Sequence, residues 1–499
     1  MAVLLALLLL IPGVGSLQAQ DTTLITLNGA SVAIDGAGAL ADGSLVTISQ
    51  SGEYRLTGTL NDGQILVNAG DGGEVTLILD GVTLNSSTSA PIYVREAGSV
   101  RLVIAEGSEN TVNDGDEYVY AEGEDEPNAA VFSDVDMLIE GSGSLTVNAN
   151  FNDGITSKDS LVIQGEPVIT VNAADDAIRG KDALSISGGT YVLNAAEGDG
   201  LKADNEDADT GNLTITGGTF TIIAGDDGVQ ATTTIAIQDG SLTITAVDDG
   251  IHADWNLNID GGVIDILGSE EGLEAGFITI NDGTIHVVSS DDGINVSEPD
   301  DIPNPELYLL SINGGYVVVD AEGDGLDSNG SIEMTGGTVL VNGPTGSMDG
   351  AIDYDGTFTI SGGLLVAAGS AGMPAAPGAQ SPQNSVLIVL DQSQSAGTLL
   401  HIQATDGTPL LTFAPAKNYQ SLVFSSPELV NGDYEVYVGG SSNGTAADGL
   451  YEGGTYTPGT LATSFTVSSP VTTGGNVRGM GPGGMGPGGQ PPAAPGGQG

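Results

Sequence analysis

The chain has 499 residues, with 66 Asp and Glu against 9 Lys and Arg, which gives a formal net charge of −57. This charge argues against nucleic acid and anionic membranes as partners, and it favours solubility and the binding of cations. The sequence contains no Cys, so neither disulfides nor thiolate metal sites can form. A chain of this length can hold a large core or more than one domain.

The first 150 residues begin with an apolar segment and continue with short alternating segments. Residues 1–19 resemble a signal peptide cleaved near Ala19, without the usual positive start, and predict a secreted or cell-surface (extracytoplasmic) protein. An uncleaved membrane anchor is the alternative, but the apolar run is short for a span. Strands are expected at residues 75–79, 100–104, 137–139 and 145–147, as the first, irregular coils of the repeat that follows.

One short motif occurs 9 times between residues 150 and 355: an acid, usually preceded by a second acid or Gly, then Gly or Ala, then an aliphatic residue. The acid directly before Gly or Ala, which we call the motif acid, lies at positions 153, 176, 199, 227, 249, 271, 292, 324 and 349. The steps between motif acids are 23, 23, 28, 22, 22, 21, 32 and 25 residues. A period this short predicts a solenoid, and the two longest steps, of 28 and 32 residues, predict loop insertions.

A second repeat, two aliphatic residues followed by Gly-Gly or Asp-Gly and an alternating strand, completes each period. Each period then holds three short strands, the layout of a parallel β-helix with about 22 residues per coil. The predicted core positions of two successive coils align as Tyr191 with Phe220, Leu193 with Ile222, and Ala195 with Ala224. The opposite phase mixes Thr with aliphatic residues, which either form a contact surface or reflect β propensity alone.

The domain organisation follows from where the period begins and ends. Residues 20–370 are predicted to form the β-helix, and residues 371–383 a Pro/Ala linker. Residues 384–468 lose the period and are predicted to form a small β domain or a cap, and residues 469–499 a disordered Gly/Pro/Met tail.

The motif acids should stack into a column, because neighbouring coils lie about 4.8 Å apart. Unit charges at that separation repel by about 0.9 kcal/mol in bulk water, and Ca²⁺ between coils would relieve the repulsion. The plainer interpretation of each single turn is that Asp bonds its own backbone, whereas the cumulative field favours at least one Ca²⁺. The predicted metal ligands are Asp176, Asp199, Asp226, Asp227, Asp248, Asp249, Glu270, Glu271, Asp291 and Asp292.

Four of the basic residues lie in three consecutive coils and predict a cationic strip beside these acids. Arg179 and Lys202 come three residues after their motif acids, and Lys158 and Lys181 come five residues after theirs. Such a strip suits an acidic sugar, although neutralisation of the neighbouring acids explains it equally well. Gln230, His252, Glu274, Asn295 and Asp327 occupy the same plus-three position in later coils. The predicted carbohydrate-binding residues are Lys158, Arg179, Lys181, Lys202, His252 and Trp255, the last of which could equally be a packing residue.

The segments before the repeats, together with the repeats, resemble the bacterial carbohydrate-binding domain-containing proteins of the pectate-lyase-like β-helix type. The resemblance covers residues 22–370, including Gly52–Leu60, Gly63–Val67, Val75–Val82, Ala105–Thr111, Pro127–Ser133 and Gly141–Leu145. It implies an extracytoplasmic right-handed β-helix with bound calcium that binds plant-type polysaccharides, such as cellulose or acidic pectic glycans, without catalysis.

The sequence is compatible with three functions. The first is a secreted, calcium-stabilised polysaccharide-binding protein. The second is a calcium-dependent lyase in which Arg179 or Lys202 removes the proton α to a uronate carboxylate, with Asp176 and Asp199 holding the metal. Neighbouring carboxylates would raise the pKa of such a base, which disfavours the lyase. The third is a purely structural surface repeat protein.

Overall fold

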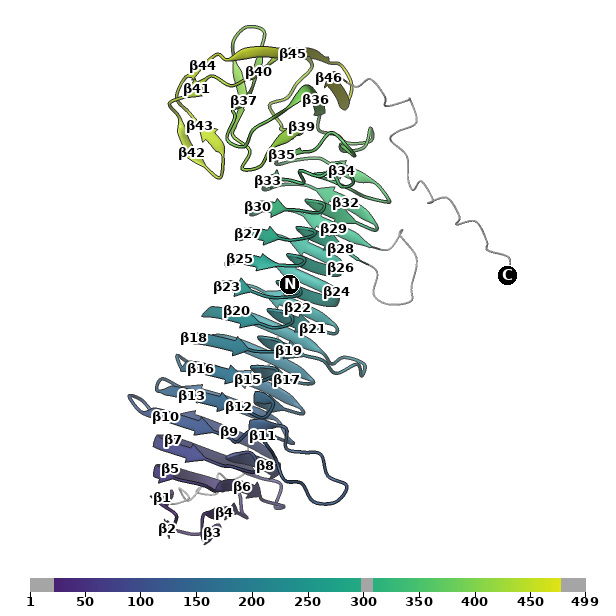
Figure 1. Cartoon of the computed structure of the whole chain (residues 1–499). Helices are drawn as coiled ribbons and strands as arrows, with labels where there is room; N and C mark the ends of the chain where they lie inside the picture. The colour runs from purple at the N-terminus through teal and green to yellow at the C-terminus, as the bar shows by residue number, and fades with distance from the viewer. Residues whose placement is uncertain (1–21, 298–307, 477–499) are drawn as a thin grey trace, which may run out of the picture.

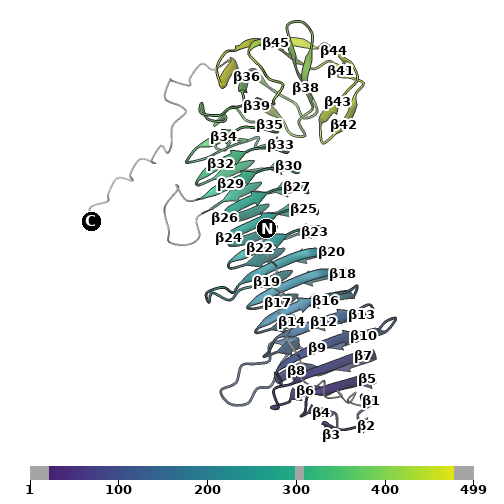
Figure 2. The same ribbon diagram turned by 180° about the vertical axis from the view of Figure 1, so that it is seen from behind.

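The computed structural model describes residues 22–297 and 308–476. All regular secondary structure in these ranges is β-strand. The strands form a 38-stranded sheet, a 6-stranded sheet and a 2-stranded sheet. The large sheet winds into a long stack of coils, and the C-terminal strands cover one end of it (Figures 1 and 2). In the described ranges no helix is long and apolar enough to cross a membrane. The predicted signal peptide, residues 1–19, lies outside these ranges.

Each coil contributes strands to three faces, and on each face a strand pairs in parallel with its counterpart in the next coil. The motif face carries the motif acids at its strand starts and comprises β4 (Leu45–Ile48), β6 (Gln64–Asn68), β8 (Ile92–Glu96), β11 (Ala129–Ser133), β14 (Asp153–Ser157), β17 (Ile178–Gly180), β19 (Leu201–Ala203), β21 (Val229–Ala231), the first parts of β24 (Ile251–Ile259) and β26 (Leu273–Ile280), β28 (Ile294–Val296) and β31 (Leu326–Ser328).

The other two faces follow the motif face in every coil. The second face comprises the first parts of β5 (Gly52–Leu60) and β7 (Glu74–Asn85), then β9 (Ser99–Ile104), β12 (Met137–Gly141), β15 (Ser160–Ile163), the first parts of β18 (Ala183–Ala195) and β20 (Asn212–Ala224), β22 (Thr234–Ile237), the last parts of β24 and β26, β29 (Leu309–Ile312), β32 (Ser331–Met334) and β34 (Phe358–Ile360). The third face comprises the last parts of β5 and β7, then β10 (Glu109–Asn113), β13 (Ser144–Ala149), β16 (Val168–Ala173), the last parts of β18 and β20, β23 (Ser241–Thr245), β25 (Val263–Ser269), β27 (Thr284–Ser289), β30 (Tyr316–Ala321), β33 (Thr338–Asn342) and β35 (Leu364–Gly369).

The interior of the stack is filled by the core positions that the alternation predicts. Tyr191 and Phe220 pair across β18 and β20, are 1% exposed, and stack with ring centroids 4.6 Å apart. A Gly pair inside each of these strands makes the corner between its first and last parts, and Gly189 and Gly218 have φ angles of 95° and 113°, a conformation that favours Gly. The predicted loop insertion of the 28-residue step is the segment between β19 and β20. The insertion of the 32-residue step includes residues 298–307, which lie outside the described residues.

Antiparallel pairing occurs at both ends of the stack. At the N-terminal end, β1 (Thr23–Gly29) pairs with β2 (Val32–Asp35), and β3 (Ala39–Asp42) pairs with β4. At the C-terminal end, β39 (Tyr419–Ser425) pairs antiparallel with both β35 and β36 (Ser385–Gln394), so residues of the predicted small β domain continue the large sheet. Residues 371–383, the expected linker, lie against the last coil, where the Gly378 N–H donates to the Phe358 carbonyl at 2.7 Å.

The remaining C-terminal strands form a separate sheet over the third face. Its order is β42 (Thr445–Ala447), β43 (Leu450–Glu452), β38 (Pro409–Phe413), β37 (Leu400–Ala404), β40 (Gly432–Val438) and β45 (Thr460–Val467), with β41 (Ser441–Ser442) and β44 (Tyr456–Thr457) paired beside it. Its core includes Val318, Leu340 and Val366 of the third face. The prediction of a disordered tail from residue 469 is wrong for β46 (Val471–Gly475), which pairs in parallel with the edge of β36.

Candidate functional site

The motif acids line the turn that leads into the motif face, and in the central coils they are buried. Asp153, Asp176, Asp199, Asp227 and Asp249 are at most 5% exposed. From coil to coil one carboxylate oxygen accepts the backbone N–H of the next motif acid: Asp176 Oδ1 from Asp199 at 2.9 Å, Asp199 Oδ1 from Asp227 at 2.8 Å, and Asp227 Oδ1 from Asp249 at 2.9 Å. These bonds explain why an acid recurs at the turn, because each carboxylate satisfies a buried donor of the next coil.

A second column of side chains runs beside the motif acids. The residues at the plus-three position, Thr156, Arg179, Lys202, Gln230, His252, Glu274, Asn295 and Asp327, are register partners in successive coils. This plus-three column was predicted from the spacing and is confirmed. Its residue type changes along the stack from cations to acids, so each stretch of the column has a different chemistry.

In the N-terminal stretch the plus-three side chain is a cation that neutralises motif acids. The Lys202 Nζ lies 2.6 Å from Asp199 Oδ2 and 3.3 Å from Asp176 Oδ1, and Arg179 Nη1 lies 3.6 Å from Asp153 Oδ2. Burial raises the pKa of Asp199 to about 7 even with Lys202 beside it. Although burial opposes it, the carboxylates of Asp176 and Asp199 raise the pKa of Lys202 above its ordinary value. Lys202 therefore stays protonated between the two buried acids.

His252 continues this arrangement in the next stretch of the column. Its Nδ1 lies 3.3 Å from Asp227 Oδ2 and 3.6 Å from Asp249 Oδ2. Burial lowers the pKa of His252, but the hydrogen bond to Asp227 outweighs it and raises the pKa to about 9. Asp227 and Asp249 also lie close enough to His252 for the three to ligate one metal ion.

In the C-terminal stretch two of the plus-three side chains, Glu274 and Asp327, are themselves acids. Oxygens of Asp249, Glu271 and Glu274 lie within 4.8 Å of one another, and so do oxygens of Asp324, Asp327 and Asp353. Burial, and then the neighbouring Glu274, raise the pKa of Asp249 and of Glu271. Such a group must take up protons or a cation, and a hard divalent cation such as Ca²⁺ prefers carboxylate oxygens.

The second acidic cluster has the same electrostatics. Burial, and then Asp292, raise the pKa of Asp327 to about 8, and burial raises that of Asp324 to about 7. Asn295 lies between the clusters in the plus-three column and donates its Nδ2 to Glu271 Oε1 at 2.8 Å. Within the described ranges the Asn295 Oδ1 is buried and has no hydrogen-bond partner, so a neutral oxygen is available beside the carboxylates.

The predicted metal ligands thus divide into two groups. Asp199, Asp226, Asp227, Asp249 and Glu271 belong to clusters of three possible ligands. The other group belongs to none of the clusters found among the described residues: Asp176, which like Asp199 pairs with Lys202, the exposed Asp248, Glu270 and Asp291, and the half-buried Asp292.

The metal ligands predicted from the sequence do not include Glu274, Asp324, Asp327 and Asp353. Glu274 and Asp327 carried the signal, because both are acids at the plus-three position. Asp353 was harder to find, because Ala351 adds one residue to the last motif. Leu326 therefore pairs with Ile352, and Asp353, the next residue, comes four residues after its motif acid instead of three.

The predicted carbohydrate-binding residues are not brought together as one free cationic strip. Lys158 Nζ lies 2.7 Å from Glu126 Oε1, and Arg179 also binds Asp204. The Lys181 N–H donates to the Ser157 carbonyl at 2.9 Å, which places its backbone beside that of Lys158, as predicted. Trp255 lies in β24 and is 38% exposed.

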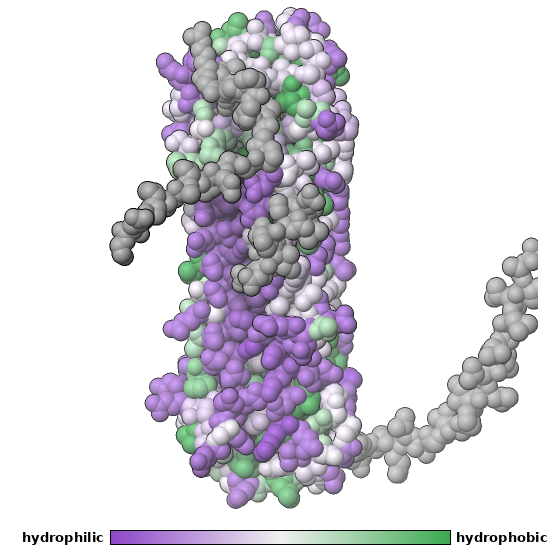
Figure 3. Space-filling view, turned by 90° about the vertical axis from the view of Figure 1, so that its right-hand side faces the viewer, coloured by the Kyte–Doolittle hydropathy of each residue, from purple (hydrophilic) through white to green (hydrophobic). Residues whose placement is uncertain are grey.

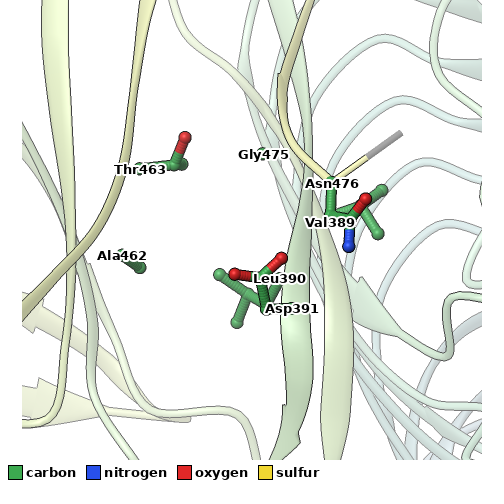
Figure 4. Close-up of a pocket in the computed structure, with 7 residues that line it drawn as sticks. All are labelled: Val389, Leu390, Asp391, Ala462, Thr463, Gly475 and Asn476. Atoms are coloured by element: carbon green, nitrogen blue, oxygen red, sulfur yellow. The ribbon is translucent and has the colours of Figure 1, made fainter. Parts of the chain in front are cut away.

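The surface of the stack is strongly polar away from the core. Hydrophilic side chains form a broad band along the length of the stack on the face that lies to the right in Figure 1 (Figure 3). A pocket of about 450 Å³ lies elsewhere, between β36, β45 and β46, and is lined by Leu390, Asp391 and Thr463 among others (Figure 4). Because a single carboxylate and no sequence-predicted residue line this pocket, the polar columns of the motif face remain the candidate site.

Comparison with known proteins identifies the family. A family model described as "Carbohydrate-binding domain-containing protein" matches residues 42–293 and 247–442, which together span most of the chain. The chain belongs to this family. A carbohydrate-binding domain-containing protein from Acetivibrio thermocellus is 39% identical over 192 residues, covering 38% of this chain and 67% of that protein.

A solved structure is also similar to part of this family member. It is described as the polysaccharide lyase-like protein from C. thermocellum, in a gadolinium derivative, and is 35% identical. The alignment covers 48% of this chain and 96% of that chain, with a TM-score of 0.46.

Proposed function

We propose that this protein is a secreted, non-catalytic polysaccharide-binding protein stabilised by calcium, with plant-type or acidic glycans such as cellulose or pectin as ligands. Membership of the carbohydrate-binding family supports the ligand class. We also propose that its coils form a right-handed β-helix of the pectate-lyase-like type, since connections between parallel strands are right-handed in almost all known cases.

The observation that carries the calcium part is the acid at the plus-three position. Glu274 and Asp327 each join two further carboxylates within 4.8 Å, where Lys202 in the earlier coils supplies an internal positive charge. Ca²⁺ takes 6 to 8 oxygen ligands, and the exposed side of each cluster would leave some of them to a uronate carboxylate. Arg179 and His252 lie in strands of the motif face, Lys158 and Lys181 directly follow such strands, and Trp255 lies further along β24. We propose that these side chains contact the rest of an acidic chain.

Binding of polygalacturonate by the full chain, with calcium or with a chelator, tests this proposal. We expect binding in calcium, loss of binding in chelator, and weak binding at either condition for the double variant Glu274→Gln/Asp327→Asn. Glu333→Gln is a matched control, because Glu333 is exposed on the second face and belongs to no acidic cluster of the described residues. Equal binding with and without calcium would contradict the proposal.

A uronate lyase is the second candidate, favoured by the presence of Arg179 and Lys202 beside carboxylates. Both side chains have raised pKa values, against the effect of burial, because of Asp204 for Arg179 and because of Asp176 and Asp199 for Lys202. A general base must lose its proton near neutral pH, so these two are poor bases. Absence of unsaturated product from polygalacturonate in calcium is the expected result, and its appearance would establish the lyase.

A further inference from the structure

The third face carries a regular uncharged array that the metal chemistry of the motif face does not use. The outward positions of four successive strands repeat Thr-x-Asn: Thr83 and Asn85, Thr111 and Asn113, Thr146 and Asn148, Thr170 and Asn172. Register places each Thr beside a Thr and each Asn beside an Asn of the next coil. We call these eight residues the Thr-Asn face; Thr59 extends the Thr row at one end and Asn194 the Asn row at the other.

The Asn side chains of this face are held in one orientation. Each Nδ2 donates to the Oδ1 of the preceding coil: Asn113 to Asn85 at 2.8 Å, Asn148 to Asn113 at 2.7 Å, Asn172 to Asn148 at 2.9 Å, and Asn194 to Asn172 at 2.9 Å. The Asn85 Nδ2 donates to the Leu60 carbonyl at 2.8 Å and anchors the ladder. The amides therefore form a pre-ordered row that repeats about every 4.8 Å along the stack, and the Thr row beside it repeats at the same spacing.

The face is also nearly free of charge in a chain whose net charge is −57. From the last part of β7 through β23, Glu109 is the only ionisable residue at the outward positions of the third face. At the other end of the same face, the separate C-terminal sheet packs on Val318, Leu340 and Val366. The C-terminal sheet thus covers one end of the third face, and the Thr-Asn face lies toward the other end, which this sheet does not cover.

We propose that the Thr-Asn face binds an extended, uncharged polysaccharide chain that lies along the stack. Thr hydroxyls and Asn amides each donate and accept hydrogen bonds, as sugar hydroxyls do. An uncharged chain also avoids the repulsion that an acidic glycan meets near this protein without bridging calcium. All eight residues are Thr or Asn, so the face lacks the aromatic and Arg side chains that anchor most protein interfaces. The proposal takes only the ligand class, carbohydrate, from the proposed function.

The test compares two matched triple variants of the full chain in a pull-down on microcrystalline cellulose, with chelator present. Thr111→Val/Thr146→Val/Thr170→Val removes three hydroxyls from the Thr-Asn face and keeps the shape and strand propensity of each residue. Thr214→Val/Thr279→Val/Thr359→Val makes the same change at half-buried outward positions of the second face. Asn148→Asp is a third variant that breaks the amide ladder and adds a charge to the face. Equal melting temperatures identify variants that are folded.

We expect the wild type to bind cellulose in chelator, the Thr-Asn variants to bind at least about tenfold more weakly, and the second-face variant to bind as the wild type does. Polygalacturonate binding in calcium should be equal in all four proteins. If the two triple variants lose cellulose binding equally, or neither loses it, the proposal is overturned. If the wild type binds polygalacturonate but not cellulose, the Thr-Asn proposal fails while the proposed function stands.

Discussion

Glu274→Gln should have opposite effects on stability with and without calcium. In metal-free protein the Glu274 carboxylate lies within 4.8 Å of those of Asp249 and Glu271. Two unit charges at that distance interact by about 3.5 kcal/mol at an effective dielectric constant of 20. Burial raises the pKa values of Asp249 and Glu271, whereas hydrogen bonds from these two side chains outweigh burial and lower the pKa of Glu274, so near neutral pH Asp249 and Glu271 must take up protons to relieve this repulsion. The neutral Gln should therefore stabilise the metal-free protein by about 1–3 kcal/mol at pH 8.

Calcium should reverse the order of the two proteins. A ligand present at 100 times its Kd stabilises the folded state by about 2.7 kcal/mol, and the variant loses one carboxylate ligand and most of this gain at its cluster. Thermal melting at pH 8, in chelator and in calcium, measures both effects. We expect the variant to melt above the wild type in chelator and below it in calcium, with Glu333→Gln unchanged. A shift of the variant's melting temperature in the same direction in chelator and in calcium would contradict this expectation.

Three further predictions concern the columns and the core. Lys202→Glu leaves the buried Asp199 without its cation and should destabilise the chelated protein by about 3–5 kcal/mol, with calcium restoring part of the loss in thermal melts; a loss that calcium does not change would speak against a new metal site. Burial raises the pKa of Asp327 to about 8, so the folded chain keeps a proton that the unfolded chain releases near pH 4. Stability of the metal-free protein should fall as pH rises from about 4 to 8, and a flat profile in urea unfolding would be contrary to this. Phe220→Ala removes a buried ring stacked on Tyr191 and should lower the free energy of unfolding in urea by about 3–5 kcal/mol. A change near zero would instead show that the stack closes the cavity.

The coil and its interior could be predicted because a single period repeats many times. Tyr191 and Phe220 have the same phase relative to the Gly pair in their coils, so their stacking follows from the alternation. The plus-three column follows from the same arithmetic, and Lys202 and His252 lie in it as expected. Repetition converts a local spacing into a contact between coils, which a non-repeating sequence does not allow.

The use of each acid could not be predicted, because the motif does not show where the two carboxylate oxygens point. Asp199 Oδ1, which the sequence alone would assign as a metal ligand, instead accepts the backbone N–H of Asp227. The C-terminal region was also beyond reach, since β36 and β39 join the large sheet by antiparallel pairing between residues distant in sequence. Val471–Gly475 has little apolar patterning, and its strand depends on the free edge of β36.

We propose that the plus-three residue decides where the acidic column holds a metal. A crystal structure of the full chain with terbium in place of calcium, phased on the anomalous signal of the metal, tests it most directly. We predict metal at Asp249, Glu271 and Glu274 and at Asp324, Asp327 and Asp353, with none between Asp176 and Asp199, where Lys202 lies. Metal bound beside Lys202, or no metal at the two acidic clusters, would contradict the account.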